Sequence, residues 1–180
     1  MSSIVISGDT SGAITLAAPA VSGTNTATLP ASTGTVMVSG NMPAFSAYQS
    51  SAQSISASTS TLVQFQTKEY DTASAFNNTG STVGNALAYG FNPQVAGYYQ
   101  INSAIQGSAA DMTVAWIYKN ASIVKQGNWI PFQQATAVSA QVYMNGTTDC
   151  IQIYVYKSAT SNLATGASAV YFQAVMVRAA

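Results

Sequence analysis

Few side chains in this sequence have the types and spacing that catalysis requires. Glu69 and Asp71 are the only close pair of carboxylates, and because residues two apart in a strand share a face, the two could converge for acid–base chemistry. They fit equally a solvated strand end beside Lys68, which is the interpretation we favour. A glycoside hydrolase needs two carboxylates on either side of the scissile bond, and the sequence scarcely provides them.

The other common catalytic arrangements lack their key residues. The chain has no histidine, which removes the commonest general base and metal ligand. Cys150 is the single cysteine, so no intrachain disulfide or thiol-based metal site can form, and its place in an alternating apolar segment predicts a buried, inert thiol. Residues 80–84 are glycine-rich, but Asn-Ala follows them where a phosphate-binding loop needs Lys-Ser or Lys-Thr. We therefore expect no enzymatic activity, no catalytic residue, no cofactor and no metal.

A few aromatic and amide side chains could instead contact a ligand. Binding sites combine aromatic rings with a small number of polar groups, as sugar sites do. The candidate contact residues are Trp129, Asn128, Trp116 and Tyr89. Trp129 lies in the turn-like stretch 127–131 and is the best candidate for an exposed ring, although packing in the core is the commoner role of such a residue.

Charged residues are rare in this chain. They make up 6% of it, five basic against five acidic, where an average soluble domain has roughly 25%. A surface with so few charges has little to keep copies of the protein apart, which favours an oligomer or a larger assembly. The alternative is a secreted β-domain with a hydroxyl-rich surface.

Several classes of partner and location are disfavoured by the same composition. The basic residues are scattered singly, so we expect no nucleic-acid binding. No apolar run approaches the roughly 20 residues of a membrane-spanning helix, and we expect no membrane insertion. The first residues lack the basic and apolar regions of a secretory signal, which favours synthesis and assembly inside a cell.

The first 40 residues differ from the rest of the chain. They contain no aromatic residue and one charge, Asp9, in short β-like pieces over 4–9, 12–16, 24–30 and 34–38. With nothing large to build a core, this segment cannot fold well alone. We expect an attachment or trimerisation arm over residues 1–42 and a head domain over residues 43–180.

Alternation with a period of two predicts strands throughout the head. In residues 97–105, for example, Tyr99, Ile101 and Ile105 share one face. Other strands are expected over 45–48, 62–70, 113–120, 137–144, 150–156 and 169–177. Asn145-Gly146 between two of them is the strongest hairpin signal. Roughly eight short strands and no helical periodicity predict an all-β, antiparallel sandwich or jelly roll.

The chain also has ten tyrosines, as many as it has charged residues. Tyr154 and Tyr156 lie opposite the apolar face of their strand and would face water in a monomeric sandwich. Interface cores favour large aromatic residues with few charges, so we interpret these tyrosines as interface residues. The alternative is that they pack against neighbouring strands of their own sheet.

The order of motifs in the head resembles that of the C1q-like and tumour-necrosis-factor-like (TNF-like) jelly-roll family. The matching stretches are residues 45–48, 97–101, 117–120, 142–146, 149–155 and 171–177. This resemblance implies a homotrimer in which one sheet of each jelly roll packs around a threefold axis. The chain has no collagen-like region and no acidic clusters, so the family's calcium site is not carried over.

Residues 12–35 are similar to a segment near the N-terminus of tailed-bacteriophage virion proteins. This resemblance implies a structural virion protein, a trimeric decoration or fibre protein on the exterior of the head or tail. It would be synthesised in the host cytoplasm and attached through its arm to other capsid or tail proteins. The alternatives are a tail receptor-binding protein that recognises host surface polysaccharide or protein, and a cellular adhesin-like domain.

Overall fold

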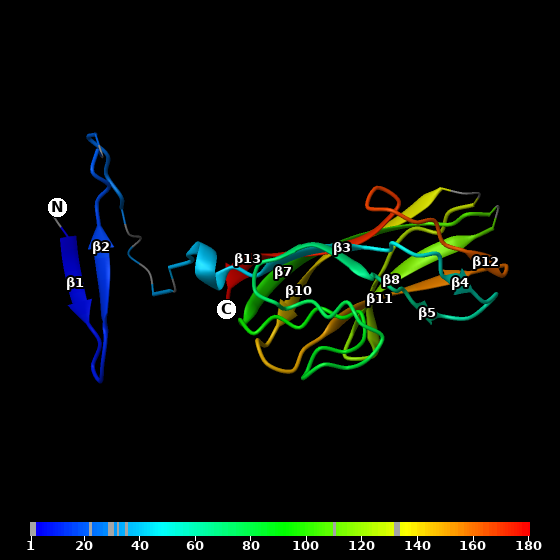
Figure 1. Ribbon diagram of the computed structural model, residues 1–180, viewed down its shortest axis with the longest axis horizontal. Coiled ribbons are helices and arrows are strands. Elements are labelled where there is room, and N and C mark those ends of the chain that lie inside the picture. The colour runs from blue at the N-terminus through cyan, green and yellow to red at the C-terminus, as the bar shows by residue number, and fades with distance from the viewer. Residues whose placement is uncertain are drawn as a thin grey trace. The chain divides into compact units, whose positions relative to one another are not determined.

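A computed structural model gives the fold of the chain (Figure 1), and it describes residues 3–21, 23–28, 31, 33, 34, 36–109, 111–131 and 134–180. The one helical segment among them is the 3₁₀ turn η1 (Ser39–Asn41), and none of their helices is long and apolar enough to cross a membrane. The chain forms two compact units, Met1–Gly34 and Thr35–Ala180. The boundary expected at residues 42 and 43 stays a prediction, although Met37 already packs against the core of the second unit.

The first unit contains one antiparallel hairpin of β1 (Ser3–Ser7) and β2 (Ala13–Ala17). Gly12 adopts a φ of +77° in the connecting turn, where the Gly8 amide donates to the Gly12 carbonyl at 2.9 Å. Two of the four expected β-like pieces are therefore strands. The described residues of the other two, 24–30 and 34–38, form none, and Leu29, Pro30 and Thr35 lie outside the described residues.

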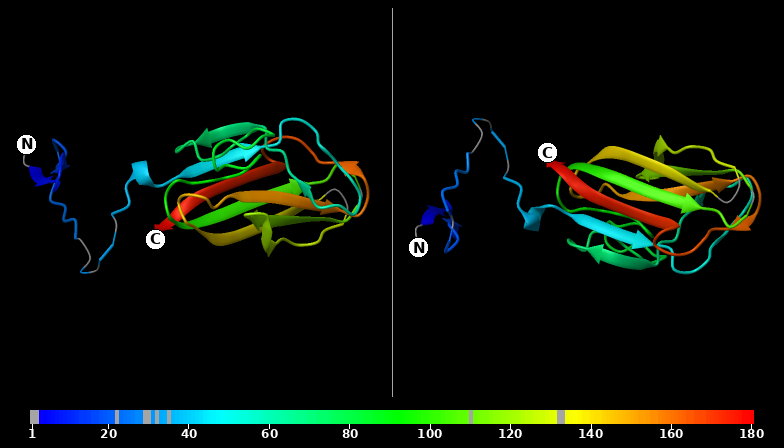
Figure 2. Two further views of the ribbon diagram at one scale, coloured as in Figure 1. Left: turned by 90° about the horizontal axis from the view of Figure 1, so that it is seen from below. Right: turned by 90° about the horizontal axis from the view of Figure 1, so that it is seen from above.

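The second unit is an antiparallel sandwich. Its five-stranded sheet has the order β10 (Ala135–Met144), β7 (Gly97–Gln106), β13 (Val170–Ala179), β3 (Ala44–Tyr48) and β6 (Thr67–Asp71). Its four-stranded sheet has the order β5 (Thr61–Leu62), β11 (Ile151–Lys157), β8 (Thr113–Lys119) and β9 (Ser122–Gln126), and a small sheet pairs β12 (Ser161–Asn162) with β4 (Ser54–Ile55). Figure 2 shows the two large sheets as facing layers. The expected all-β fold class is confirmed.

The inward faces of the two sheets share one core. Phe45 on β3 lies at its centre, with its ring centroid 4.6 Å from those of Phe76 and Phe91 and 4.8 Å from that of Phe172. Ring pairs at such distances contribute attraction beyond the burial of their area. Tyr99 on β7 is also fully buried, and its hydroxyl donates to the Val95 carbonyl at 2.8 Å. Burial raises the pKa of Tyr99 to about 12.

The expected hairpin at Asn145-Gly146 is wrong, because β10 and β11 belong to different sheets. Residues 145–150 instead carry the chain from one layer to the other. Asn145 Oδ1 holds this connection by accepting hydrogen bonds from the amides of Thr147, Thr148 and Asp149, each at 3.0 Å. Gly146 has a φ of +74°, and a Cβ there would meet the backbone of Ala96. The glycine is therefore needed where this connection passes close to the chain at Ala96, just as a glycine would be needed in a tight hairpin turn.

A true two-residue hairpin occurs at the end of the strand expected over 113–120. Asn120 and Ala121 have φ values of 50° and 65°, and they join β8 directly to β9. Alanine seldom adopts positive φ, so this turn has no clear sequence signal. The strand expected over 62–70 is interrupted as well, because residues 63–66 lie between β5 and β6 with Val63 and Phe65 in the core.

Candidate functional site

The two carboxylates that could have formed a catalytic pair have separate partners. Asp71 Oδ2 lies 2.8 Å from Lys68 Nζ, and the Asp71 carboxylate also accepts the amide of Ala75 at 2.9 Å. Glu69 Oε2 accepts the hydroxyl of Ser46 at 2.6 Å. Asp71 therefore stabilises the loop that follows β6, and Glu69 links β6 to β3.

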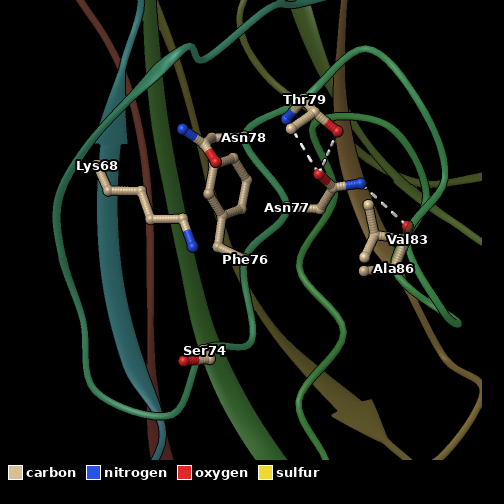
Figure 3. A pocket seen from close by; sticks show the side chains of 8 residues that line it. All are labelled: Lys68, Ser74, Phe76, Asn77, Asn78, Thr79, Val83 and Ala86. Carbon is tan, nitrogen blue, oxygen red and sulfur yellow. Dashed lines mark hydrogen bonds between the residues drawn. The ribbon is translucent and has the colours of Figure 1, made fainter.

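A pocket lies beside the same strand (Figure 3). Its lining residues are Lys68, Ser74, Phe76, Asn77, Asn78, Thr79, Val83 and Ala86. The amides in it have partners within the protein: Asn77 donates to the Ser81 carbonyl at 2.7 Å and accepts from Thr79, and Asn78 donates to the carbonyl of Gln66, just before β6, at 2.9 Å. These hydrogen bonds give the amides a role in shaping the loop.

The remaining acidic groups of the head are also paired. Lys119 Nζ lies 2.7 Å from Asp149 Oδ2, and Lys157 Nζ lies 3.3 Å from Asp111 Oδ2 in a buried pair. Partial burial alone would raise the pKa of Asp149, but hydrogen bonds from Lys119, Asn120 and the Asn145 amide, with the Lys119 charge, lower it below its usual value. In the described part of the chain no three Cys, Asp or Glu residues gather as metal ligands would.

Cys150 is buried, as the sequence predicted. Burial raises the pKa of its thiol to about 11, partly offset by a backbone hydrogen bond. A thiol with so high a pKa is almost wholly protonated at neutral pH and is a poor nucleophile.

Five aromatic side chains form a row on the outer face of the four-stranded sheet. They are Trp129, Tyr156, Trp116, Tyr154 and Tyr118, and we call them the aromatic row. Ring centroids are 5.4 Å apart for Trp129 and Tyr156, 5.9 Å for Trp116 and Tyr156, and 4.1 Å for the stacked pair Tyr118 and Tyr154. The pairing of Tyr154 directly with Trp116 between β11 and β8 sets these contacts.

Hydroxyl and amide groups flank the aromatic row. Trp116 Nε1 donates to Gln126 Oε1 at 3.1 Å, Tyr118 shares a hydrogen bond with Ser60, and the Tyr156 hydroxyl donates to Ser58 at 3.4 Å. Burial and the neighbouring Tyr118 raise the pKa of Tyr154. The row itself carries no charge, so it offers ring faces and neutral polar groups to a ligand.

The structure brings two of the four predicted contact residues together in the aromatic row. Trp129 and Trp116 both contact Tyr156, and Trp129 is 46% exposed, so it is not a core residue. Asn128 has a structural role, since its Oδ1 accepts the Ala137 amide at 3.1 Å.

Tyr89, the fourth residue, lies in the loop between β6 and β7. It adopts a φ of 49°, and its amide donates to the Thr79 carbonyl at 3.1 Å. The sequence-based set omitted Tyr118, although its alternation with Trp116 on one strand was a usable signal.

The outer face of the five-stranded sheet is the second candidate surface, which we call the neutral face. Apart from Arg178 near the end of β13, the outward side chains on β10, β7, β13 and β3 are uncharged; they include Ala137, Ser139, Gln141, Tyr143, Tyr98, Gln100, Asn102, Ala104, Tyr171, Gln173, Val175, Ala44, Ser46 and Tyr48. Part of it is a hydrogen-bonded network, in which Gln100 donates to Ser139 at 2.9 Å and Ser139 donates to Asn102 at 2.7 Å. Three charged groups lie at its margins: Arg178 pairs with Tyr98 at the end of β13, Glu69 on the edge strand β6 accepts the Ser46 hydroxyl, and Lys119 Nζ lies 5.7 Å from the centroid of the Tyr143 ring.

No protein-family model matches the sequence, and a search of curated proteins finds no significant match. Solved structures do match the fold. Murine APRIL at pH 8.5 is 9% identical with a TM-score of 0.54, covering 76% of this chain and 99% of that chain, and murine APRIL at pH 5.0 is 8% identical with a TM-score of 0.55. Eiger TNF from S. frugiperda is 12% identical with a TM-score of 0.53, covering 77% of this chain and 93% of that chain. The chain thus has the TNF-like jelly-roll fold that its motif order implied.

Proposed function

We propose that this chain is a non-enzymatic structural protein that works as a homotrimer on the exterior of a bacteriophage particle. The observation that carries the trimer is the neutral face. Burying a charge between subunits is costly unless the charge is paired, whereas neutral side chains are buried at much lower cost. Interface cores are depleted of charge and enriched in tyrosine, and this face has both properties.

The apolar content of the neutral face supports the same assignment. Val175, Tyr98 and Tyr143 are each more than 40% exposed on it, and the two tyrosine rings lie 5.4 Å apart. Contact between copies would remove this apolar area from water, which is the main favourable term in association. The TNF-like fold and the motif resemblance agree with packing one sheet of each copy around a threefold axis.

The trimer is tested by placing a charge at the centre of the neutral face. We expect the unchanged chain to have three times its 18.6 kDa mass in solution, and Val175→Asp to reduce it to a monomer. Ile123→Asp is the matched control, because Ile123 is an exposed apolar residue of β9 in the other sheet. A monomeric unchanged chain, or a Val175→Asp variant that dissociates no more readily on dilution than the Ile123→Asp variant, would contradict the proposal.

Salt dependence provides a further check. Contacts between neutral side chains are not screened by salt, whereas exposed ion pairs are weakened strongly at 1 M ionic strength. The trimer should therefore keep its mass in 1 M sodium chloride. Dissociation there would mean that ion pairs hold the subunits together.

The phage location is supported by the resemblance of residues 12–35 to N-terminal segments of virion proteins. In this proposal the arm attaches the protein to capsid or tail proteins and the head projects outward. Electron microscopy of intact particles labelled for this protein tests it directly. Label on the head or tail surface supports the proposal, and purified particles without the protein would refute it.

The aromatic row favours a second candidate function, recognition of a host surface glycan by a tail receptor-binding protein. Sugar rings stack on aromatic faces, and an uncharged row with flanking hydroxyl and amide groups suits a neutral polysaccharide. The test is adsorption of the labelled protein to host cells. Trp129→Ala should abolish adsorption, and Tyr70→Ala, which removes an equally exposed ring from β6, should not.

A further inference from the structure

The hairpin of the first unit has one wholly apolar face. Ile4 pairs with Leu16 and Ile6 pairs with Ile14, so these four side chains lie together on one side of the two strands. They are between 56% and 68% exposed. The opposite side carries mainly small or hydroxyl side chains: Ser3, Val5, Ser7, Ala13, Thr15 and Ala17. We call the first side the aliphatic face.

Among the described residues of the first unit, none covers the aliphatic face, since all four of its side chains stay more than half exposed. The other large apolar residues described there are Val5, which lies on the opposite side of the hairpin, and Val21, which is 92% exposed. A single two-stranded hairpin is marginally stable in water at best, and three or more strands or a packed partner are needed for stability. The aliphatic face therefore requires a partner from outside this unit.

We propose that the partner is the aliphatic face of two other copies, so that three hairpins pack around a common threefold axis. This inference rests on the trimeric head proposed above. The aliphatic face has no charged or hydrogen-bonding group on it that would select a different partner. Asp9, the single charge of the first 40 residues, lies in the turn between the strands and stays in water in this arrangement.

The chain between the two units allows this packing. Residues 18–36 separate β2 from Met37, which packs on the head. Fully extended, this stretch reaches about 65 Å. It is long enough for three hairpins to meet even if the three Met37 residues of a trimeric head lie well apart. Covalent attachment to a common head also raises the local concentration of the hairpins, which favours contact between copies over capture of a separate protein.

The arrangement also accounts for the composition of the second side of the hairpin. With the aliphatic faces on the axis, the opposite side, with Val5 among serine, threonine and alanine side chains, points outward, where solvent or a capsid or tail protein can contact it. The contact between the hairpins of different copies is therefore the feature to test.

Cysteine cross-linking in the full-length chain tests the packing. Ile6→Cys places a thiol on the aliphatic face, and Val5→Cys places one on the opposite side of the same strand. Cys150 does not interfere because it is buried. Under mild oxidation we expect most of the Ile6→Cys chains to form disulfide-linked dimers, because two of the three thiols in each trimer can pair. The Val5→Cys chains should stay largely uncross-linked.

The mass in solution and the amide hydrogen exchange of the unchanged chain separate the possible results. A trimer with protected amides over residues 3–17 and cross-linking at position 6 supports the inference. A trimer whose hairpin amides exchange at the rate of an unfolded peptide, or which cross-links equally at both positions, overturns the inference and leaves the trimeric head intact. A monomer overturns the proposed trimer, and the packing of three hairpins with it.

Discussion

The arm and the head use the same residue types with opposite outcomes. Ile101 on β7 and Ile153 on β11 are fully buried, whereas Ile4 and Ile14 in the hairpin are mostly exposed. Alternation of apolar residues produces strands in both units. Burial requires a second layer, which two facing sheets supply in the head and a single hairpin cannot supply for itself.

The largest effect is expected from truncating a side chain in the core of the head, which the arm lacks. Phe172→Ala removes a fully buried ring that contacts Phe45, Phe65 and Phe76, and we expect it to lower the free energy of unfolding by about 3–5 kcal/mol. Urea unfolding at one protein concentration, followed by tryptophan fluorescence, measures it, because both tryptophans lie in the head. A loss below about 1 kcal/mol would contradict the core described here.

The next effect concerns the buried ion pair. Asp111→Ala leaves Lys157 fully buried without its carboxylate, and it also removes the acceptor of the Ser161 hydroxyl, so we expect a loss of about 3 kcal/mol. Lys68→Met provides the comparison, because Lys68 is partly exposed and its pair with Asp71 should contribute about 1 kcal/mol or less. Equal losses in the two variants would mean that burial does not decide the contribution of these pairs.

Alternation made the head largely predictable from sequence. β7, β10, β11 and β13 lie within one or two residues of their expected bounds, because each has one face in a core that both sheets share. Asn145-Gly146 misled because the same dipeptide suits any tight change of direction, and nothing local says whether the next strand joins the same sheet.

The aromatic row was predicted only in part for a related reason. Trp116 and Tyr154 lie far apart in the chain, and the register of β8 against β11 brings them together. Such a register depends on long-range packing, which no local pattern contains. In the arm, the aliphatic face appears only when β1 and β2 are paired, since Ile4 and Leu16 become neighbours through that pairing.

A smaller effect is expected from Asp149 and should depend on pH. Its pKa is lower in the folded chain than in the unfolded chain, so its contribution is present above about pH 4 and is lost as the pH falls through the lower, folded value. Asp149→Asn should therefore lower the free energy of unfolding by about 1–2 kcal/mol at pH 7 and by much less at pH 3. Urea unfolding of both chains at several pH values measures the difference. A difference that does not change with pH would exclude the carboxylate charge as its cause.

The smallest effect is expected in the arm, from Val5→Ala. Val5 is exposed on the side of the hairpin away from the aliphatic face, so the substitution removes apolar atoms that already contact water. The free energy of unfolding of the head should change by less than about 0.5 kcal/mol. The corresponding truncation Ile101→Ala, in the buried strand β7, should cost about 2–5 kcal/mol. Fluorescence-detected unfolding of the two variants compares the same kind of change in the two units. If Val5→Ala destabilised the head as much as Ile101→Ala does, the stability of the head would depend on the arm. That result would contradict the division of the chain into two units with separate packing.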